Sequence, residues 1–295
     1  MRACVIFNPT AKGDKARHFR RHVDELGAGI ALKPTQAPGD GRRLAAEAVR
    51  EGFDTIVAAG GDGTVNEVLN GLADVPDGFA RVRFAVLPLG TVNVFARELS
   101  LPLNLRAAWA TLTNGHERRV DAPFAEFNQA GKFQRRYFAQ LAGAGLDAHA
   151  IARVDWNLKK RIGPLAYGVA GVKAMRGPHP RIVVEANGQM VAGEFVLVGH
   201  GRFYGGSVTV FPEARLDDGL LDVCVFPCVN WPLIARYAWG FITGRPLIPQ
   251  TAQWVRAATA TLRAEAAVPF ELDGDVCGEL PVTLGLQPRE LRVLA

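Results

Sequence analysis

The sequence predicts an α/β domain with a parallel sheet, followed by an antiparallel β-sandwich domain. Apolar strand-like runs alternate with amphipathic helical segments up to about residue 118, and short strand-like runs separated by turn residues dominate afterwards. A length of 295 residues also exceeds the usual size of one domain. We therefore assign residues 1–118 to the first domain, to which residues from about 288 to 295 return, and residues 119–287 to the second.

The first domain is expected to contain parallel strands joined by crossover helices. Each strand-like run is short and apolar, and segments with helical periodicity follow, as in Val65, Val68, Leu69 and Leu72. This rhythm is typical of a parallel sheet. The expected strands are 4–7, 31–35, 55–59 and 84–87, and further helices are expected at 15–26, 41–51 and 92–99.

The second domain is expected to consist mainly of short antiparallel strands. Asn187-Gly188 is a strong signal for a two-residue hairpin turn. Asp222 is expected to point to solvent from its strand, and Trp156–Arg176 is a basic, partly helical exception. The expected strands are 137–141, 181–186, 194–199, 221–226, 258–263, 268–272 and 282–284.

Composition and charge exclude several classes of protein. With 48% hydrophobic and 21% charged residues, the chain can bury a sizeable core and is not a disordered protein. The basic excess is small (34 − 29 = 5), and no nucleic-acid-binding module is recognisable, so nucleic acid is not an expected partner. The longest apolar stretch, 229–244, contains Pro232 and Arg236 and is too short to span a bilayer. Four cysteines without zinc-site spacing are expected to be reduced thiols, and the protein is expected to be cytoplasmic.

A glycine-rich loop carries the main functional signal. The strand ending at Ala59 runs into Gly60–Thr64, Gly-Gly-Asp-Gly-Thr, and a helix follows. Glycines let the backbone approach a ligand closely, and a helix N-terminus offers unpaired N–H groups and partial positive charge to phosphate. The loop is neither a Walker loop nor a dinucleotide-binding turn. An ordinary turn with Asp62 as helix cap is the alternative interpretation.

Two further polar loops strengthen the prediction of a phosphate site. Leu87–Asn93 again ends a strand and opens a helix, and Asn8–Gly13 follows the first strand. In an open parallel sheet, all three loops would lie at the carboxyl ends of the strands, where ligands bind. We therefore expect a nucleotide site at this edge.

Taken together, these segments resemble the diacylglycerol-kinase catalytic domain, and most closely its bacterial lipid-kinase branch, which is related to sphingosine kinases and more distantly to NAD kinases. The motifs follow the family's order through essentially the whole chain. The resemblance implies a Rossmann-like, NAD-kinase-like first domain, a β-sandwich second domain and an active site between them. The resembling segments are Asn8-Pro9, Gly60–Val68, Leu87–Arg97, Gly201–Gly206, Ala214–Val223 and Leu272–Asp275.

The resemblance also implies cofactors and residue roles, with ATP as phosphate donor and Mg²⁺ as the metal. Asp275, at the family's Glu position, would take the proton from the lipid hydroxyl. Asp62 would organise magnesium or phosphate and is the second candidate for the base. A structural Mg²⁺ would be held by Asp218 with backbone carbonyls near Arg215 and Leu220. ATP would contact Asn8, Thr35, Gly60, Gly61, Asp62, Gly63, Thr64, Val65, Asn66, Glu67 and Thr91.

The chain departs from the family pattern at three positions. Val94 stands where many relatives have Asp, Lys12 stands where the first loop often has Gly, and Asp275 is one methylene shorter than Glu. A carboxylate of either length can accept a proton, so the reach of Asp275 is in question more than its chemistry. Without the resemblance, both Asp275 and Asp218 also fit simple turn residues.

The sequence leaves the acceptor and the partners open. The leading hypothesis is a kinase that transfers the γ-phosphate of ATP to diacylglycerol or a related lipid at the inner membrane surface. Trp156–Arg161 could contact an anionic bilayer or be a packed helix with a basic face. A kinase of a soluble substrate such as NAD is one alternative. A nucleotide-binding regulator without turnover, suggested by Val94 and Asp275, is another, and a homodimer is left open.

Overall fold

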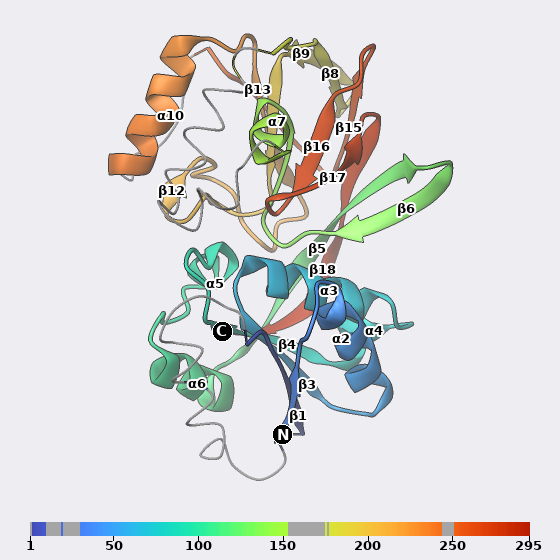
Figure 1. Ribbon diagram of the computed structural model, residues 1–295, viewed down its shortest axis with the longest axis vertical. Coiled ribbons are helices and arrows are strands. Elements are labelled where there is room, and N and C mark those ends of the chain that lie inside the picture. Colours follow the sequence, from blue (N-terminus) through green and yellow to red (C-terminus); the bar gives the residue numbers. More distant parts are fainter. Residues whose placement is uncertain (1, 10–18, 20–29, 153–174, 176, 244–250) are drawn as a thin grey trace.

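The protein has two domains, as a computed structural model that describes residues 2–9, 19, 30–152, 175, 177–243 and 251–295 shows. The first domain forms the lower half of Figure 1 and the second the upper half, and both chain termini lie in the lower half. The predicted fold class is confirmed: parallel strands with helices are followed by an antiparallel β-sandwich.

Four parallel strands form the sheet of the first domain. In spatial order they are β2 (Ile30–Pro34), β1 (Ala3–Phe7), β3 (Thr55–Gly60) and β4 (Arg83–Pro88). Their ends are aligned, because Phe7 pairs with Pro34 and Ala59, and Ala59 pairs with Leu87. The chain segments that follow β1, β3 and β4 therefore leave the sheet at one edge.

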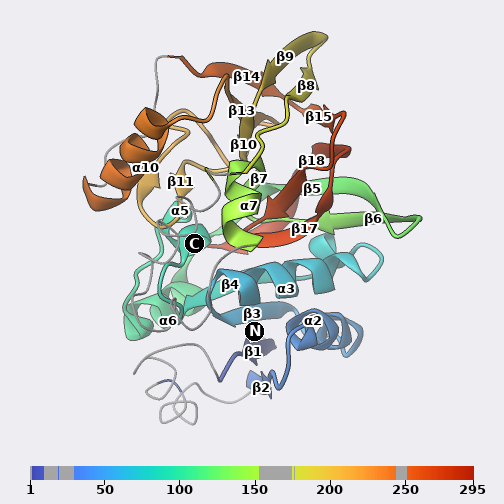
Figure 2. The same cartoon turned by 45° about the horizontal axis from the view of Figure 1, so that its top comes forward.

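Helices cover both faces of this sheet (Figures 1 and 2). On one face, α2 (Asp40–Arg50) and α3 (Asp62–Ala73) bury their apolar sides, and α6 (Leu105–Asn114) packs on the other. Two short helices, α4 (Gly78–Arg81) and α5 (Val94–Glu98), follow α3 and β4. The helix α5 begins two residues later than the predicted helix 92–99, because Asn93 takes a left-handed conformation with φ 54°.

Two 13-residue strands connect the domains. The strands β5 (Glu117–Gln129) and β18 (Val282–Leu294) pair along their length, and β6 (Lys132–Tyr137) pairs with β5. Near its end β18 lies beside β4, and near its start it pairs with β15 (Thr259–Ala264). One ten-stranded sheet thus continues from the first domain into the second.

The sandwich is completed by a second sheet of six antiparallel strands. In spatial order they are β14 (Gln253–Ala257), β13 (Leu221–Phe226), β10 (Phe195–Gly199), β7 (Leu141–Gly145), β16 (Pro269–Leu272) and β17 (Asp275–Glu279). Its inner face packs on β15, β18, β5 and β8 (Ile182–Ala186), which pairs with β9 (Gln189–Gly193). The outer face is covered by α7 (Leu146–Ala152), α10 (Trp231–Thr243), β11 (Phe203–Tyr204) and β12 (Val208–Thr209).

Several local predictions are confirmed, two are wrong, and one strand is longer than predicted. The hairpin turn is confirmed, with left-handed Asn187 and Gly188 between β8 and β9. The predicted strand 137–141 is wrong, because β6 ends there and the chain crosses to β7 in the other sheet. The strand predicted at 282–284 continues to Leu294. Asp222 does not point to solvent but is buried beside Arg256. The predicted helix 15–26 and the basic stretch 156–176 fall, apart from residues 19 and 175, outside the described residues.

Candidate active site

The glycine-rich loop and the loop after β4 pack backbone against backbone. The amides of Leu89 and Gly90 donate to the carbonyl of Gly60 at 2.9 and 3.2 Å. A Cβ placed on Gly90 would lie 2.5 Å from the Cα of Gly61, which is closer than real Cβ contacts. Glycine is required here because any side chain would force the two loops apart.

The start of α3 faces an open side of the molecule. The helix begins at Asp62, directly after β3, and Gly63 is exposed, with no atom within 4 Å of where its Cβ would be. The first N–H groups of a helix have no intrahelical partner, and the helix dipole adds partial positive charge. A twelve-residue helix that follows a glycine turn in this way can bind a phosphate group.

Asp62 joins the two loops. Its Oδ1 accepts a hydrogen bond of 2.7 Å from the backbone amide of Val94 at the start of α5. Burial and the nearby charge of Asp273 raise the pKa of Asp62, while the amide of Val94 lowers it. Position 94 therefore contributes a backbone N–H that any residue except proline would supply.

The other predicted nucleotide contacts lie around the same sheet edge. Asn8 Nδ2 is 3.4 Å from Thr64 Oγ1, and the amide of Thr35 donates to Phe7 O at 2.8 Å. Thr91 is exposed, whereas Val65 is buried in the core. Their contact with ATP stays a prediction, and Lys12 lies outside the described residues.

Glu67 already has partners in the protein. Its two carboxylate oxygens accept the amides of Gly39 and Gly41, each at 2.8 Å. These bonds fix the start of α2, and a Cβ on Gly41 would lie 2.6 Å from Glu67 Oε2. In this arrangement Glu67 holds the backbone between β2 and α2 in place.

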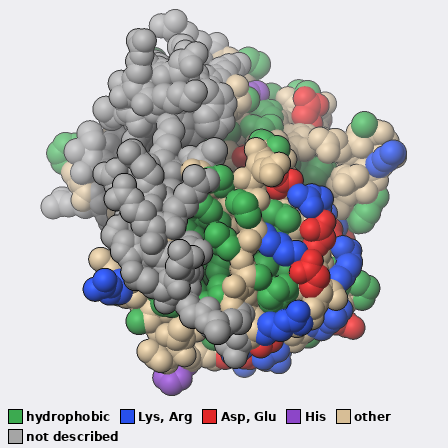
Figure 3. Space-filling model, turned by 60° about the horizontal axis from the view of Figure 1, so that its bottom comes forward, with side chains coloured by type: hydrophobic (Ala, Val, Ile, Leu, Met, Phe, Trp, Pro, Cys, Tyr) green, Lys and Arg blue, Asp and Glu red, His purple; other side chains and the backbone are tan. Residues whose placement is uncertain are grey.

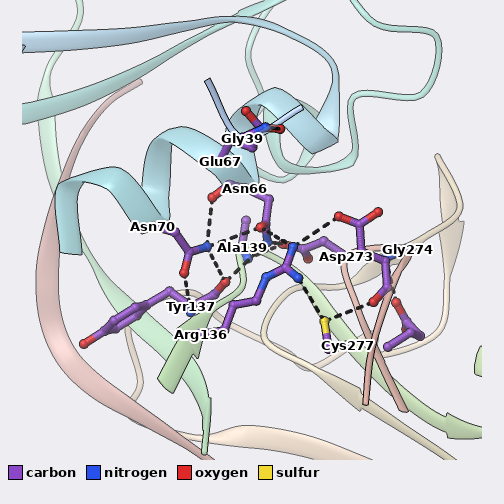
Figure 4. A network of polar contacts seen from close by, with 12 residues as sticks. Gly39, Asn66, Glu67, Asn70, Arg136, Tyr137, Ala139, Asp273, Gly274 and Cys277 are labelled. Atoms are coloured by element: carbon purple, nitrogen blue, oxygen red, sulfur yellow. Dashed lines mark hydrogen bonds and ion pairs between the residues drawn. The ribbon is translucent and has the colours of Figure 1, made fainter. Parts of the chain in front are cut away.

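Opposite α3, the second domain presents the turn between β16 and β17. Asp273 and Gly274 form this turn with positive φ angles of 49° and 90°. The Asp273 carboxylate accepts hydrogen bonds from Asn66 Nδ2 at 2.8 Å and from three amides of the 139–141 segment at 2.6–3.1 Å. Figure 4 shows this network between the domains. Sequence reasoning missed Asp273, although the Leu-Asp-Gly turn signal was present two residues before Asp275.

Asp275 lies beside this network and remains accessible. Its side chain is 61% exposed, and Oδ2 is 3.2 Å from Arg136 Nη2. The same nitrogen of Arg136 donates to Asn66 Oδ1 at 3.1 Å, and Nη1 contacts Cys277 Sγ (Figure 4). Arg136 thus connects Asp275 with the helix of the glycine-rich loop, and sequence reasoning did not single out this arginine.

Further polar contacts that no sequence motif indicated hold the two domains together. Buried Glu98 accepts from Arg202 Nε at 2.9 Å, from the Arg202 amide at 2.7 Å and from Gln140 Nε2 at 3.0 Å. Asn70 of α3 bonds both backbone groups of Tyr137, each at 2.9 Å. These contacts cross from α3 and α5 to the second domain and fix the distance between the glycine loop and the β16–β17 turn.

The predicted structural metal site has an arginine in it. Asp218 Oδ2 is 2.5 Å from Arg256 Nη2, and Oδ1 accepts the Leu220 amide at 3.1 Å. Arg215 is exposed, with its guanidinium 3.6 Å from Asp217. No group of three His, Cys, Asp or Glu side chains suited to a metal occurs in the described part of the chain. Because the guanidinium occupies the Asp218 carboxylate, this arrangement does not fit a divalent cation, and the magnesium expected there stays an untested prediction.

A pair of buried carboxyl groups lies behind the β16–β17 turn. Glu271 Oε2 accepts the Gly274 amide at 2.6 Å, and Asp147 accepts the Tyr204 hydroxyl at 2.6 Å. Their remaining oxygens both come within about 3 Å of where a Cβ of Gly143 would lie. Burial raises the pKa of Asp147 to about 6, and burial together with the charge of Asp147 raises the pKa of Glu271 well above its usual range. The pair therefore resists double ionisation.

Comparison with known proteins points to one family. Residues 2–124 match the diacylglycerol kinase catalytic domain, and residues 140–295 match the YegS C-terminal NAD kinase beta sandwich-like domain. A diacylglycerol kinase of Bacillus subtilis (strain 168) is 31% identical over 292 residues, covering 95% of this chain and 91% of the relative. One of Staphylococcus carnosus (strain TM300) is 29% identical over 287 residues, with 95% and 90% covered.

Solved structures share the fold over almost the whole chain. The structure of a diacylglycerol kinase from Bacillus anthracis (strain Sterne) aligns with a TM-score of 0.72 at 23% identity, covering 99% of this chain and 96% of the other. A second structure from the same organism aligns with a TM-score of 0.76 at 24% identity, with 99% and 97% covered.

The fold and these matches define the chain as a lipid kinase, a transferase that phosphorylates an alcohol group. The chain belongs to the bacterial diacylglycerol kinase family. Within the described residues, no helix is both long and apolar enough to cross a bilayer.

Proposed function

We propose that the protein transfers the γ-phosphate of ATP to a hydroxyl of diacylglycerol or a related lipid, with Mg²⁺ bound together with the nucleotide. The observation that carries this proposal is the position of two elements from different domains. The glycine-rich start of α3 lies opposite the β16–β17 turn, and Asn66 connects them through Asp273 and Arg136. A kinase needs a phosphate cradle and a base for the attacking hydroxyl on opposite sides of the transferred group.

The two sides have different tasks in this proposal. Backbone amides from Gly61 to Thr64 bind the phosphates, and the Gly90 contact keeps the loop narrow. Asp275, exposed at the start of β17, accepts the proton of the lipid hydroxyl. Asp273 is fully engaged with four donors, so its role is to position the turn.

Asp62 is the side chain best suited to organise magnesium with the nucleotide. Burial and the charge of Asp273 raise the pKa of Asp62, so a cation bound beside it would relieve an unfavourable concentration of negative charge. The chemistry that Mg²⁺ supplies in phosphoryl transfer is neutralisation and alignment of the phosphate oxygens.

The proposed setting is the cytoplasmic face of the membrane, where ATP and a lipid substrate meet, with peripheral contact to the bilayer. The described cysteines are free thiols, in accord with a reducing compartment. The related lipids that the sequence leaves open as acceptors, such as phosphatidylglycerol or sphingoid bases, are lipid alcohols like diacylglycerol.

The test is incubation of the purified protein with γ-labelled ATP, Mg²⁺ and a panel of lipid alcohols in mixed micelles. We expect label in a phosphorylated lipid, with diacylglycerol as the preferred acceptor. NAD is added as a soluble acceptor in a parallel reaction. Label in NAD and in none of the lipids would contradict the proposal, and no transfer to any acceptor would favour a nucleotide-binding regulator.

A further inference from the structure

The helix α10 exposes tryptophans on one side. Trp231 and Trp239 are each 59% exposed, whereas Leu233 and Gly240 are buried. Successive residues of an α-helix are rotated by about 100° around its axis. Among the described residues of α10, all exposed ones therefore lie within an arc of roughly 140°, and the two buried ones lie outside that arc. The exposed positions are Trp231, Pro232, Ala235, Arg236, Trp239 and Thr243.

The helix is attached to the sandwich by its buried side. Leu233 packs in the apolar cluster that contains Phe195 and Phe226, and its amide donates to Asn230 Oδ1 at 3.0 Å. Figures 1 and 2 both place α10 at the outer corner of the second domain. The tryptophan side is thus carried by a helix that is anchored in the core and presented at the periphery.

The sequence around α10 has no negative charge. Between Asp222 and Glu265 no Asp or Glu occurs, whereas four arginines do: Arg236, Arg245, Arg256 and Arg263. Two of them are compensated from outside this stretch, because Arg256 pairs with Asp218 and Asp222 and Arg263 with Glu185. Arg236 is exposed in the middle of α10 and forms no ion pair with another described residue. Three of the chain's five tryptophans fall in this stretch, including Trp254, which is also exposed.

Other exposed features of the described chain lack this combination. Phe133 and Met190 are each single apolar side chains on hairpin strands. Figure 3 shows the opposite end of the molecule, where Lys and Arg side chains lie among Asp and Glu. On α2, Arg42 pairs with Asp74 and Arg43 pairs with Glu47, so the positive charge of these arginines is compensated.

We propose that the exposed side of α10 binds the interface of an anionic phospholipid membrane. Tryptophan side chains prefer the headgroup level of a bilayer, where the ring is buried and the indole N–H stays hydrated. A helix lying in the plane of the membrane buries its apolar side, while cations nearby are attracted to anionic headgroups. This inference rests on the proposed function, because it states how the kinase reaches a membrane-resident acceptor.

The binding test compares the wild type with the double variant Trp231→Ala/Trp239→Ala. Each protein is sedimented with vesicles made of phosphatidylglycerol and phosphatidylethanolamine, and the bound fraction is measured. We expect the wild type to bind these vesicles better than pure phosphatidylcholine vesicles, and the double variant to bind at least about tenfold more weakly. Phe133→Ala/Met190→Ala is the matched control, since it removes two exposed apolar side chains elsewhere and should bind like the wild type. Arg236→Glu should weaken binding to the anionic vesicles while keeping both tryptophans.

The activity test separates this inference from the proposed function. With a water-soluble short-chain diacylglycerol, the double tryptophan variant should turn over like the wild type, which also shows that it is folded. With long-chain diacylglycerol in vesicles, its rate should fall in proportion to its binding. If the wild type binds vesicles but phosphorylates neither lipid, the proposed function is overturned and the inference about α10 is not.

Two outcomes would overturn the inference. One is unchanged vesicle binding and vesicle activity of the double variant. The other is a wild-type dimer that the substitutions convert to a monomer without any effect on vesicle binding, which would make α10 a subunit interface.

Discussion

Two aspartates two residues apart have different environments. Asp273 accepts four hydrogen bonds, three of them from backbone amides, and connects α3 to the second domain. Asp275 is mostly exposed and contacts one arginine. Turn propensity places both at a hairpin, but spacing alone does not tell which side chain folds back onto buried amides. This explains why sequence reasoning selected Asp275 and overlooked Asp273.

Asp273→Asn should destabilise the protein. The amide NH₂ would replace one accepting oxygen and face backbone N–H groups, which leaves donors unsatisfied. We expect a loss of about 1–3 kcal/mol in the free energy of unfolding, measured by urea denaturation. Asp275→Asn is the control, since its exposed carboxylate should change stability by less than about 0.5 kcal/mol. Equal midpoints for the two variants would contradict the assigned roles.

At the scale of elements, the contact between the two glycine loops sets the shape of the phosphate cradle. The rhythm of strands and helices predicted that these loops share a sheet edge, and the alignment of β1, β3 and β4 confirms this. The close approach of Gly61 and Gly90 was not predictable, because it depends on the distance between two strands and not on either loop alone.

Gly90→Ala should open this contact. A Cβ would lie 2.5 Å from Gly61 Cα, so the backbones must separate, at a cost of about 1–3 kcal/mol in stability. Gly63→Ala should be tolerated in the folded state, because no atom lies within 4 Å of its Cβ position. Thermal unfolding of both variants checks the expectation, and a Gly63→Ala loss as large as that of Gly90→Ala would refute it.

At the scale of the whole molecule, the strand β18 and the buried polar groups unite the two domains. The predicted strand was too short because the second half of β18 contains Pro288 and charged residues, which interrupt the apolar pattern typical of a strand. In the structure this half pairs with β5, and the backbone amide of Arg289 donates a hydrogen bond of 2.7 Å to Asp121 Oδ1. Residues distant in sequence supply these partners, so patterns within one segment could not reveal them. The α/β order, the sandwich and the positions of the motifs were predictable because each depends on local periodicity.

The buried carboxyl pair should make stability depend on pH. An unfolded Asp ionises near its ordinary pKa of about 4, whereas folded Asp147 keeps its proton up to about pH 6. Between these values the folded state binds more protons, so the free energy of unfolding falls as pH rises, by about 1.4 kcal/mol per pH unit for one such group.

Asp147→Asn should remove the part of this slope that Asp147 contributes, while burial still raises the pKa of Glu271. The amide NH₂ can face the Glu271 carboxyl group, and the amide oxygen can still accept from the Tyr204 hydroxyl. Urea denaturation from pH 4 to 7 should therefore show the variant losing less stability than the wild type as pH rises. The exposed Asp77→Asn should follow the wild type, and parallel curves for Asp147→Asn and wild type would mean that Asp147 is not the titrating group.

The most direct test of the proposed division between phosphate cradle and base is the Asp275→Asn variant assayed for both ATP binding and transfer of label to diacylglycerol. A carboxylate that acts as base contributes a factor of roughly 10²–10⁴ to the rate, while the cradle is formed by the other domain. For Asp275→Asn we predict an ATP affinity within about twofold of that of the wild type and a rate of phosphate transfer lower by roughly 10²–10⁴. The control variant Asp77→Asn should match the wild type in both ATP affinity and transfer rate. Transfer at the wild-type rate, or loss of ATP binding together with transfer, would contradict this account.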